Sequence, residues 1–171
     1  MEFRLPTCTV RSWRHGDEES LARYANNRNV WVNLRDAFPH PYTREDAVQW
    51  IKYACGTLPE TNFAIEVEGA AAGSIGFVIQ PDVHRVSAEI GFWLGEPFWG
   101  RGIMTQALRA VTERAFEEHS LHRLFAAAFE WNAASMRVLE KAGYRREALL
   151  RRSAIKDGRV IDQALYAITR D

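Results

Sequence analysis

The pattern of apolar and polar positions predicts several strands in the first half of this chain. In a half-buried strand, apolar residues occupy every second position because successive side chains point to opposite faces. The segment 62–69 alternates in this way, and 8–14, 71–80 and 85–95 are also interpreted as strands. Gly69 lies at the turn into 71–80, so 62–69 and 71–80 are expected to form an antiparallel hairpin.

Two helices are predicted in the first part of the chain. The segment 17–27 begins with acidic residues, which favour the first turn of a helix. Two prolines exclude helix and central strand from 35–43. Thr43 follows, with Asp46 three residues later and apolar residues at helical spacing beyond it. A second helix is therefore expected to begin at Thr43.

The centre of the chain predicts a βαβ unit. Apolar residues recur at helical spacing from about Ile103 to His119, and an unbroken apolar run follows at 122–130. Such a run is typical of a strand buried on both faces. Two strands joined through a helix run parallel, so 85–94 and 123–129 are expected to pair in that way.

A helix and a hairpin are predicted to complete the chain. Asn132 is a suitable N-cap for a helix that stops at Gly143. The turn KDGR then separates two long strands, 144–155 and 160–169. The expected fold class is α/β (an α+β mixed sheet), mostly antiparallel, with one parallel βαβ crossover and helices on its faces.

Composition is that of an ordinary globular protein. The chain has 171 residues, 47% of them apolar, which suits a single domain, 1–171, with one sizeable core. The formal net charge is zero, which argues against a nucleic-acid binder that relies on a global basic field. From Arg137 to Arg159, however, eight residues are basic and three acidic. This excess is compatible with a local anion site and with a solvated edge hairpin.

The sequence favours a cytoplasmic protein with no membrane contact and no metal. No apolar run approaches the roughly 18 residues of a membrane span, and the N-terminus lacks the apolar stretch of a signal peptide. Cys8 and Cys55 lie far apart, so neither a disulfide framework nor metal-ligand spacing is expected. His119 and His122 have no further evident ligands and suit the charge of a helix C-terminus better.

The segment WGRGIMT, Trp99–Thr105, places two glycines around an arginine where a helix is expected to begin; it is called the glycine loop below. One explanation is a strand-to-helix loop that needs glycine for its turn. A dinucleotide fingerprint is excluded, because its third glycine would fall at Thr105. The other explanation is an anion site, in which helix N-terminal amides bind phosphate and Arg101 adds a charged donor. The loop alone leaves both open.

Four stretches together resemble the GNAT superfamily of acetyl-CoA-dependent N-acetyltransferases, most of all its RimJ/RimL branch. They occur in the family's order and span nearly the whole chain: FPHPYTREDAVQWI (38–51), AEIGFWLGEPFWGRGIMTQAL (88–108), FEWNAASMRVLEKAGYRREA (129–148) and KDGRVIDQALYAI (156–168). The resemblance implies the GNAT acyl-CoA N-acyltransferase fold. It also implies transfer of an acetyl group from acetyl-CoA to a primary amine.

The resemblance implies a set of residues for the acetyl-CoA side. In that family, the loop after the fourth strand has the form Q/R-x-x-G-x-G/A, and its backbone amides hold the pyrophosphate of coenzyme A. Trp99 and Met104 depart from this general pattern, although Trp at the first position is usual in the branch. Amides near Phe92 and Leu94 would polarise the thioester carbonyl. The implied cofactor-binding residues are Phe92, Trp93, Leu94, Trp99, Gly100, Arg101, Gly102, Ile103, Met104, Thr105 and Asn132.

The same resemblance implies two residues for the chemistry. Glu89 is the candidate general base. The equally weighted alternative is that Glu89 is an ordinary glutamate that faces solvent. Asn132 would contact the pantetheine arm while also capping its helix. Ser135 would stabilise the leaving sulfur, unless it is a first-turn serine of no consequence. Many family members carry a tyrosine for this purpose where this chain has Leu139. Transfer in the family is direct, so neither cysteine is assigned as a nucleophile.

In this branch, the segment between the first helices forms a wall for the amine acceptor. The implied substrate-binding residues of this acceptor segment, 31–42, are Trp31, Asn33, Arg35, Asp36, Phe38, His40 and Tyr42. The aromatic ones would serve equally as core, and Arg35 and Asp36 as a local ion pair. Both charge signs are present, whereas a polyamine site should be strongly acidic.

The cost of neutralising the amine separates the acceptor classes. At pH 7 an α-amine of pKa about 7.7–8.0 costs about 1 kcal/mol to deprotonate, and a lysine of pKa about 10.4 costs about 4.6 kcal/mol. The leading acceptor is therefore the N-terminal α-amine of a protein or peptide, such as a ribosomal protein. The alternatives are a small amine, such as a polyamine or aminoglycoside, and a non-catalytic acyl-CoA sensor. The chain is expected to be a monomer or a homodimer.

Overall fold

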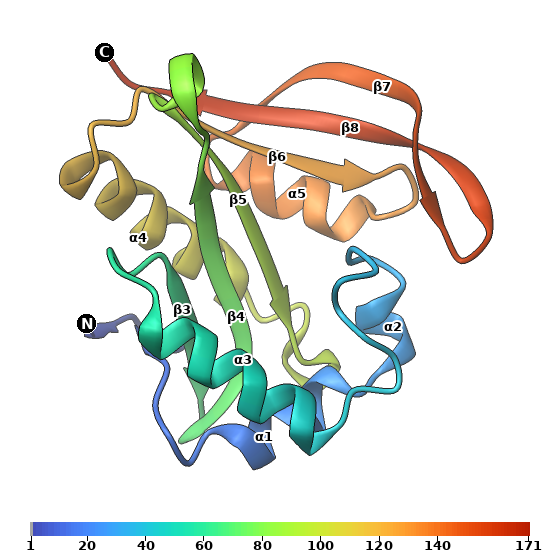
Figure 1. The fold of residues 1–171 in the computed structure, drawn as a ribbon. Coiled ribbons are helices and arrows are strands. Elements are labelled where there is room, and N and C mark those ends of the chain that lie inside the picture. Colours follow the sequence, from blue (N-terminus) through green and yellow to red (C-terminus); the bar gives the residue numbers. More distant parts are fainter. Residues whose placement is uncertain (1) are drawn as a thin grey trace. The chain divides into compact units, whose positions relative to one another are not determined.

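The computed structural model describes residues 2–171, which form an eight-stranded sheet with helices (Figure 1). The strands are β1 (Glu2–Arg4), β2 (Thr9–Ser12), β3 (Asn62–Val67), β4 (Ala70–Ile79), β5 (Ser87–Leu94), β6 (Arg123–Phe129), β7 (Arg145–Lys156) and β8 (Arg159–Thr169). The helices are α1 (Glu18–Ala25), α2 (Arg28–Trp31), α3 (Arg44–Gly56), α4 (Ile103–Glu118) and α5 (Ala133–Lys141), with 3-10 turns η1 (Asp82–His84) and η2 (Glu96–Phe98).

The sheet has the order β1-β2-β3-β4-β5-β6-β8-β7. β5 and β6 run parallel, on either side of the α4 crossover. The pairs β1–β2, β2–β3, β3–β4, β6–β8 and β7–β8 are antiparallel. The predicted fold class, a mostly antiparallel mixed sheet with one parallel crossover, is confirmed.

The chain divides into two compact units. The first unit consists of the chain up to Gly76 together with Phe92–Ala107, and the second of Phe77–Gly91 together with Leu108–Asp171. β4, β5 and α4 each contribute residues to both units. The single domain expected over 1–171 stays a prediction.

The first unit is built around an apolar cluster that joins α1 and α3 to β3 and β4. In Figure 1 α3 lies across these strands and α1 lies near the lower end of β4. Alanine predominates in the cluster, and its small side chain lets a helix backbone approach the sheet closely. The buried members are Trp13, Leu21, Ala25, Tyr42, Ala47, Ile51, Ala54, Ala64 and Ala71.

α3 begins with a capping box, as the spacing of Thr43 and Asp46 predicts. The Thr43 hydroxyl accepts a hydrogen bond from the Asp46 amide at 3.2 Å, and the Asp46 carboxylate accepts from the Thr43 amide at 2.7 Å. The Thr43 hydroxyl, which also donates to that carboxylate at 2.6 Å, and the Thr43 amide lower the pKa of Asp46. Side chains of α3 therefore satisfy the start of their own helix.

The second unit contains the parallel pair and the long β7–β8 hairpin. Thr112 of α4 and the Tyr144 hydroxyl share a hydrogen bond of 2.8 Å, and the Tyr166 hydroxyl of β8 donates to Glu140 of α5 at 2.8 Å. α5 lies along β6 and β8 in Figure 1. The apolar face predicted for α4 is confirmed, because its members are all buried: Met104, Ala107, Leu108, Val111 and Ala115.

Three features differ from the sequence-based expectations. β1 and α2 are additional elements, too short to show a period. The first helix ends at Ala25 rather than at 27, because Asn27 is extended and caps α2. The β7–β8 pairing shifts register at two places, and Arg152 has a φ of +51° at the second of them. Inserted residues of this kind, one at the first shift and two at the second, leave the alternation of a strand incomplete.

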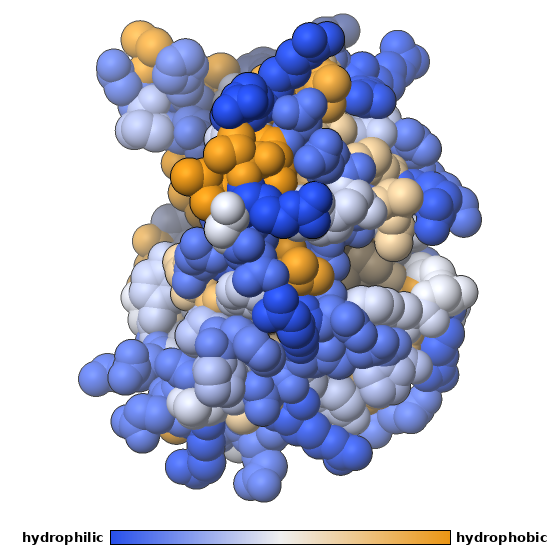
Figure 2. Space-filling model, turned by 90° about the vertical axis from the view of Figure 1, so that its right-hand side faces the viewer, coloured by the Kyte–Doolittle hydropathy of each residue, from blue (hydrophilic) through white to orange (hydrophobic). Residues whose placement is uncertain are grey.

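The face of the molecule in Figure 2 is mostly hydrophilic, with small groups of apolar atoms among the polar side chains. Leu149, Ile155 and Val160 of the β7–β8 hairpin are among the exposed apolar residues. Scattered apolar side chains are normal on a protein surface and identify no site by themselves. No helix within residues 2–171 is long and apolar enough to cross a membrane.

Candidate active site

The glycine loop follows η2, which comes after β5, and includes the start of α4 within the first unit. Gly100 and Gly102 have φ values of +76° and +75°, which residues with side chains rarely adopt. A Cβ built on either glycine meets no heavy atom within 4 Å. Backbone conformation, and not crowding by the chain, therefore requires glycine here.

The start of α4 carries amide groups that the helix itself leaves without acceptors. The Gln106 amide donates to the Gly102 carbonyl at 3.3 Å, the first bond of the helical ladder. The amides of 102–105 precede that bond and have no partner in the helix. Gly102 has no side chain to cap them, whereas Thr43 and Asn132 cap α3 and α5. The helix dipole adds partial positive charge, so this start favours a bound anion.

Two side chains of the loop turn inward and leave its backbone accessible. Ile103 is 1% exposed and Met104 is 7% exposed, so both belong to the core. The Trp99 indole N–H donates to the Leu94 carbonyl at 2.7 Å, which ties the start of the loop to the end of β5. The groups of Ile103 and Met104 offered to a ligand are therefore main-chain amides.

Arg101 extends from the loop to the β3–β4 turn. Its guanidinium donates to the Glu68 carboxylate at 2.9 Å and lies 5.6 Å from the centroid of the Phe98 ring. Both members of the ion pair are largely exposed. An anion bound at the loop would compete with Glu68 for the Arg101 side chain.

An aromatic group joins the acceptor segment to the end of β5, also within the first unit. Phe38 contacts Trp93 edge to face, with ring centroids 5.6 Å apart, and contacts Tyr42 at 4.8 Å. Trp31 stacks on His40 at 5.5 Å. The structure thus brings the predicted cofactor residue Trp93 against Phe38, a predicted acceptor residue that in turn contacts Tyr42. Phe92 lies beside Trp93 on β5 and is half-buried, and Leu94 is buried.

The other acceptor candidates differ in their exposure. Arg35, Asp36 and His40 are exposed, and Asn33 is half-buried and donates to the Asn29 carbonyl at 2.9 Å. Tyr42 is 7% exposed. Burial, with a smaller effect of the nearby Asp46 carboxylate, raises the pKa of the Tyr42 phenol. The Tyr42 phenol therefore stays neutral. Tyr42 belongs to the apolar cluster of the first unit as well as to the predicted acceptor segment.

Glu96 is a functional candidate that the sequence did not suggest. Its carboxylate accepts hydrogen bonds from the Asn27 side-chain amide at 2.6 Å and from the Asn29 side-chain amide at 3.0 and 3.1 Å. Hydrogen bonds from Asn27, and then from Asn29, lower the Glu96 pKa. The two asparagines flank the start of α2, so Glu96 connects this short helix to the segment that precedes the glycine loop.

The second unit holds the remaining predicted residues. Glu89 is half-buried on β5 and lies in register with Phe125 of the parallel strand β6. The Asn132 side chain accepts a hydrogen bond from the Ser135 amide at 3.0 Å, which confirms the predicted N-cap of α5. Ser135 is half-buried, and its hydroxyl makes no hydrogen bond to any residue within 2–171.

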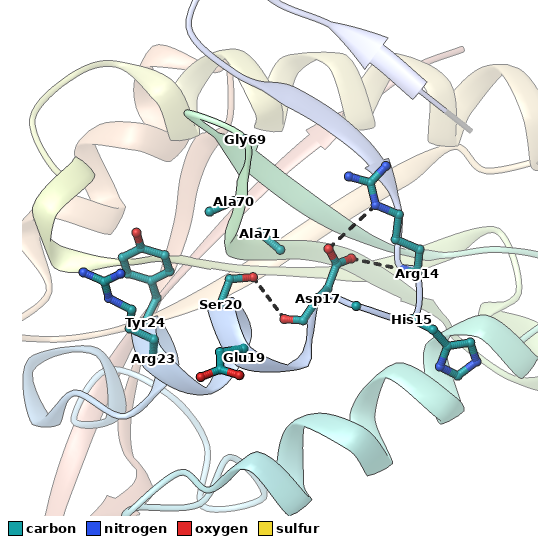
Figure 3. Close-up of a pocket in the computed structure, with 11 residues that line it drawn as sticks. Arg14, His15, Asp17, Glu19, Ser20, Arg23, Tyr24, Gly69, Ala70 and Ala71 are labelled. Carbon is teal, nitrogen blue, oxygen red and sulfur yellow. Dashed lines mark hydrogen bonds and ion pairs between the residues drawn. The ribbon is translucent and has the colours of Figure 1, made fainter.

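A separate hollow of about 380 Å³ lies in the first unit, between the start of α1 and the β3–β4 turn (Figure 3). Asp17 at its edge accepts from the Arg14 amide at 3.1 Å and from the buried Arg11 guanidinium at 2.7 and 2.8 Å. These bonds hold the turn from β2 into α1. None of the predicted site residues lines the hollow, so it is distinct from the glycine loop. Within the described residues, no group of three or more His, Cys, Asp or Glu side chains is placed to hold a metal ion.

Comparison with known proteins identifies the family. Residues 8–145 match the acetyltransferase (GNAT) domain. The chain belongs to the GNAT acetyltransferases. The match runs from before β2 to the start of β7 and includes the glycine loop, Glu89 and Ser135. The family expected from the four stretches is confirmed.

Individual GNAT relatives match this chain to different extents. The probable N-acetyltransferase YjcK of Bacillus subtilis is 43% identical over 82 residues, 48% of this chain and 45% of that protein. The ribosomal-protein-serine acetyltransferase of Escherichia coli is 32% identical over 105 residues, 61% of this chain and 58% of that protein. The chain thus matches about half the length of these two relatives.

A solved GNAT structure covers nearly the whole chain. Mycobacterium smegmatis RimJ in complex with CoA-disulfide has a TM-score of 0.85 and 25% identity, over 99% of this chain and 86% of that chain. The RimJ/RimL resemblance is thereby confirmed at the level of the branch. The roles of individual site residues stay predictions.

Proposed function

We propose that this GNAT protein transfers the acetyl group of acetyl-CoA to the N-terminal α-amine of a protein or peptide. The observation that carries the proposal is the open start of α4, where two glycines of positive φ precede amides without a capping side chain. The Thr43 side chain closes the start of α3, whereas no side chain does so at α4. The location proposed for the enzyme and its acceptor is the cytoplasm.

The residues of the glycine loop fit the pyrophosphate of acetyl-CoA. The amides of 102–105 would accept its negative charge at the positive end of the helix dipole. Arg101 would add a charged hydrogen bond on exchanging Glu68 for phosphate. Because Ile103 and Met104 are buried, their side chains leave the approach to the backbone clear. Acetyl-CoA, when bound, supplies the acetyl group as an activated thioester.

Four groups of the chain then have separate tasks in the transfer. Amides near Phe92 and Leu94 would polarise the thioester carbonyl, as oxyanion donors do. Glu89 would accept a proton from the amine, through water if needed. Asn132 would orient the pantetheine arm with the side-chain amide N–H that the helix cap does not use. Ser135, whose hydroxyl is not engaged by a described residue, would donate to the leaving sulfur.

Two considerations support an α-amine as the acceptor. A lysine costs about 3.5 kcal/mol more than an α-amine to deprotonate at pH 7, which one weak base does not offset easily. The exposed part of the acceptor segment carries Arg35 beside Asp36, and not the cluster of acids that a polyamine requires. The ribosomal-protein-serine acetyltransferase among the relatives is consistent with a protein acceptor.

A product analysis tests this function. The protein is incubated with acetyl-CoA and a mixture of short peptides with free N-termini, N-terminally blocked peptides with an internal lysine, spermidine and an aminoglycoside. Mass spectrometry should find acetylation of peptide α-amines, with blocked peptides and spermidine nearly unmodified. Dominant acetylation of lysine or of a small amine would overturn the acceptor. Acetyl-CoA binding without any acetylated product would favour the sensor.

A further inference from the structure

We propose that Glu96 is a positioning residue that holds α2, and with it the start of the acceptor segment, against the glycine loop, so that amine binding depends on it. Its two carboxylate oxygens accept from Asn27 at 2.6 Å and from Asn29 at 3.0 and 3.1 Å. These partners lie 69 and 67 residues earlier in the chain. This inference rests on the proposed function, because it concerns the acceptor side of that same site.

Hydrogen bonds continue from Glu96 in both directions. On one side, the Glu96 carbonyl accepts from the amide of Trp99, the first residue of the glycine loop, at 3.1 Å. On the other side, the Asn29 carbonyl accepts from the side chain of the predicted acceptor residue Asn33 at 2.9 Å. An unbroken series of bonds within the first unit therefore runs from the glycine loop through Glu96 to the acceptor segment.

α2 depends on these bonds more than a longer helix would. It has four residues, and an isolated helix of that length is unstable in water. The Asn27 side chain caps α2 by accepting from the Asn29 amide at 2.8 Å, and its other end donates to Glu96. A change at Glu96 therefore releases the cap residue and the second residue of α2 together.

The core of the first unit does not include this arrangement. Its apolar cluster is formed by Trp13, α1, α3, the β3–β4 hairpin and Tyr42 at the end of the acceptor segment, and neither Glu96 nor any residue of α2 belongs to it. Loss of the Glu96 bonds should therefore displace the start of the acceptor segment, whose end Tyr42 keeps in the cluster, without unfolding the unit. The low pKa of Glu96 keeps the carboxylate charged, and bonds to a charged acceptor are the stronger ones.

Paired substitutions test the inference. Glu96→Gln replaces the oxygen that only Asn29 contacts with an amide N–H, so that two donors face each other there and Asn29 keeps only the 3.1 Å bond to the oxygen it shares with Asn27. Asn29→Asp alone places two carboxylates together. In the double variant, the new carboxylate at position 29 accepts from the new amide at position 96, whose oxygen still accepts from Asn27. Each single change should raise the KM of the best acceptor from the product analysis about fivefold or more, and the double variant should recover to within about twofold of the wild type.

Three further measurements distinguish positioning from a structural brace. The Kd of acetyl-CoA, measured by calorimetry, should stay within about twofold in both single variants. Thermal midpoints should change little. Glu113→Gln, which removes a surface ion pair with Arg170 in the second unit, is the matched control and should leave the acceptor KM unchanged.

An unchanged KM in Glu96→Gln, equal losses of acceptor and acetyl-CoA binding, or no recovery in the double variant would overturn the inference. A wild-type protein that acetylates no amine would instead overturn the proposed function.

Discussion

α3 and α4 both begin in the first unit, and they begin in opposite ways. At the start of α3, the side chains of Thr43 and Asp46 each accept a hydrogen bond from the backbone amide of the other residue. The start of this helix therefore has its own hydrogen-bond acceptors. At the start of α4, Gly100 and Gly102 hold a positive φ and offer no side chain, so that the amides of 102–105 stay without acceptors in the helix. A closed start serves the stability of the fold, and an open start is suited to a ligand.

α5 lies between these two cases. The Asn132 side chain accepts a hydrogen bond from the Ser135 amide and so caps part of the helix start, as Thr43 does in α3. The same side chain keeps an N–H group that the cap does not use, as a ligand-binding residue requires. Substitutions at the three helix starts are therefore expected to differ in how much they lower stability and how much they lower acetyl-CoA affinity.

The largest expected effect is at the open start. Gly102→Val should lower acetyl-CoA affinity at least tenfold, about 1.4 kcal/mol, when measured by calorimetry. The new side chain would stand in front of amides that have open space before them. It would also strain the backbone at a φ of +75°.

Gly158→Val is the control that separates strain from ligand exclusion. Gly158 lies in the β7–β8 turn with a φ of +73°, and a Cβ there also meets nothing within 4 Å. Both variants should lose comparable stability, of the order of 1–2 kcal/mol. Only Gly102→Val should lose acetyl-CoA. Equal affinities in the two variants would remove the glycine loop from the donor site.

The closed and open starts differ in how well sequence predicts them. Thr43 with Asp46 three residues later specifies a capping box locally, and the structure contains it. The parallel pair of β5 and β6 follows from a strand, a helix and a buried strand in succession. The glycine loop alone left two explanations open, because glycine serves an ordinary turn as well as an anion site. The four stretches taken together favour the anion site, through the resemblance to the family.

The Glu96 arrangement shows what sequence patterns cannot supply. Asn27 and Asn29 look like ordinary turn residues, and Glu96 looks like a surface acid before Pro97. Their hydrogen bonds join residues that lie 67 and 69 positions apart in the chain. The side-chain periods of strands and helices, 2 and 3.6 residues, cannot indicate contacts over such distances. The pairing of Arg101 with Glu68 is of the same kind. Side-chain partners that are distant in sequence depend on the assembled unit.

The second prediction concerns the closed start. Thr43→Ala removes the cap of α3 and should lower the free energy of unfolding by about 1 kcal/mol, measured by denaturant titration. Thr43→Ser keeps the hydroxyl and should restore most of that loss. The acetyl-CoA Kd should not change in either variant. A drop in acetyl-CoA affinity on Thr43→Ala would show that the start of α3 also contributes to the acetyl-CoA site. The division of roles between the starts of α3 and α4 would then be wrong.

The smallest expected effect is at Asn132, where the two functions meet. Asp is as good an N-cap as Asn, so Asn132→Asp should leave the free energy of unfolding within about 0.5 kcal/mol of the wild type. It replaces the N–H group with a carboxylate oxygen, which accepts but does not donate. If Asn132 donates to acetyl-CoA, the Kd should rise about threefold, which corresponds to about 0.65 kcal/mol. Asn132→Ala, which removes cap and donor together, should lose both stability and affinity. Calorimetry and denaturant titration of the two variants separate the tasks, because an unchanged Kd in Asn132→Asp would leave Asn132 with the cap alone, as Thr43 has in α3.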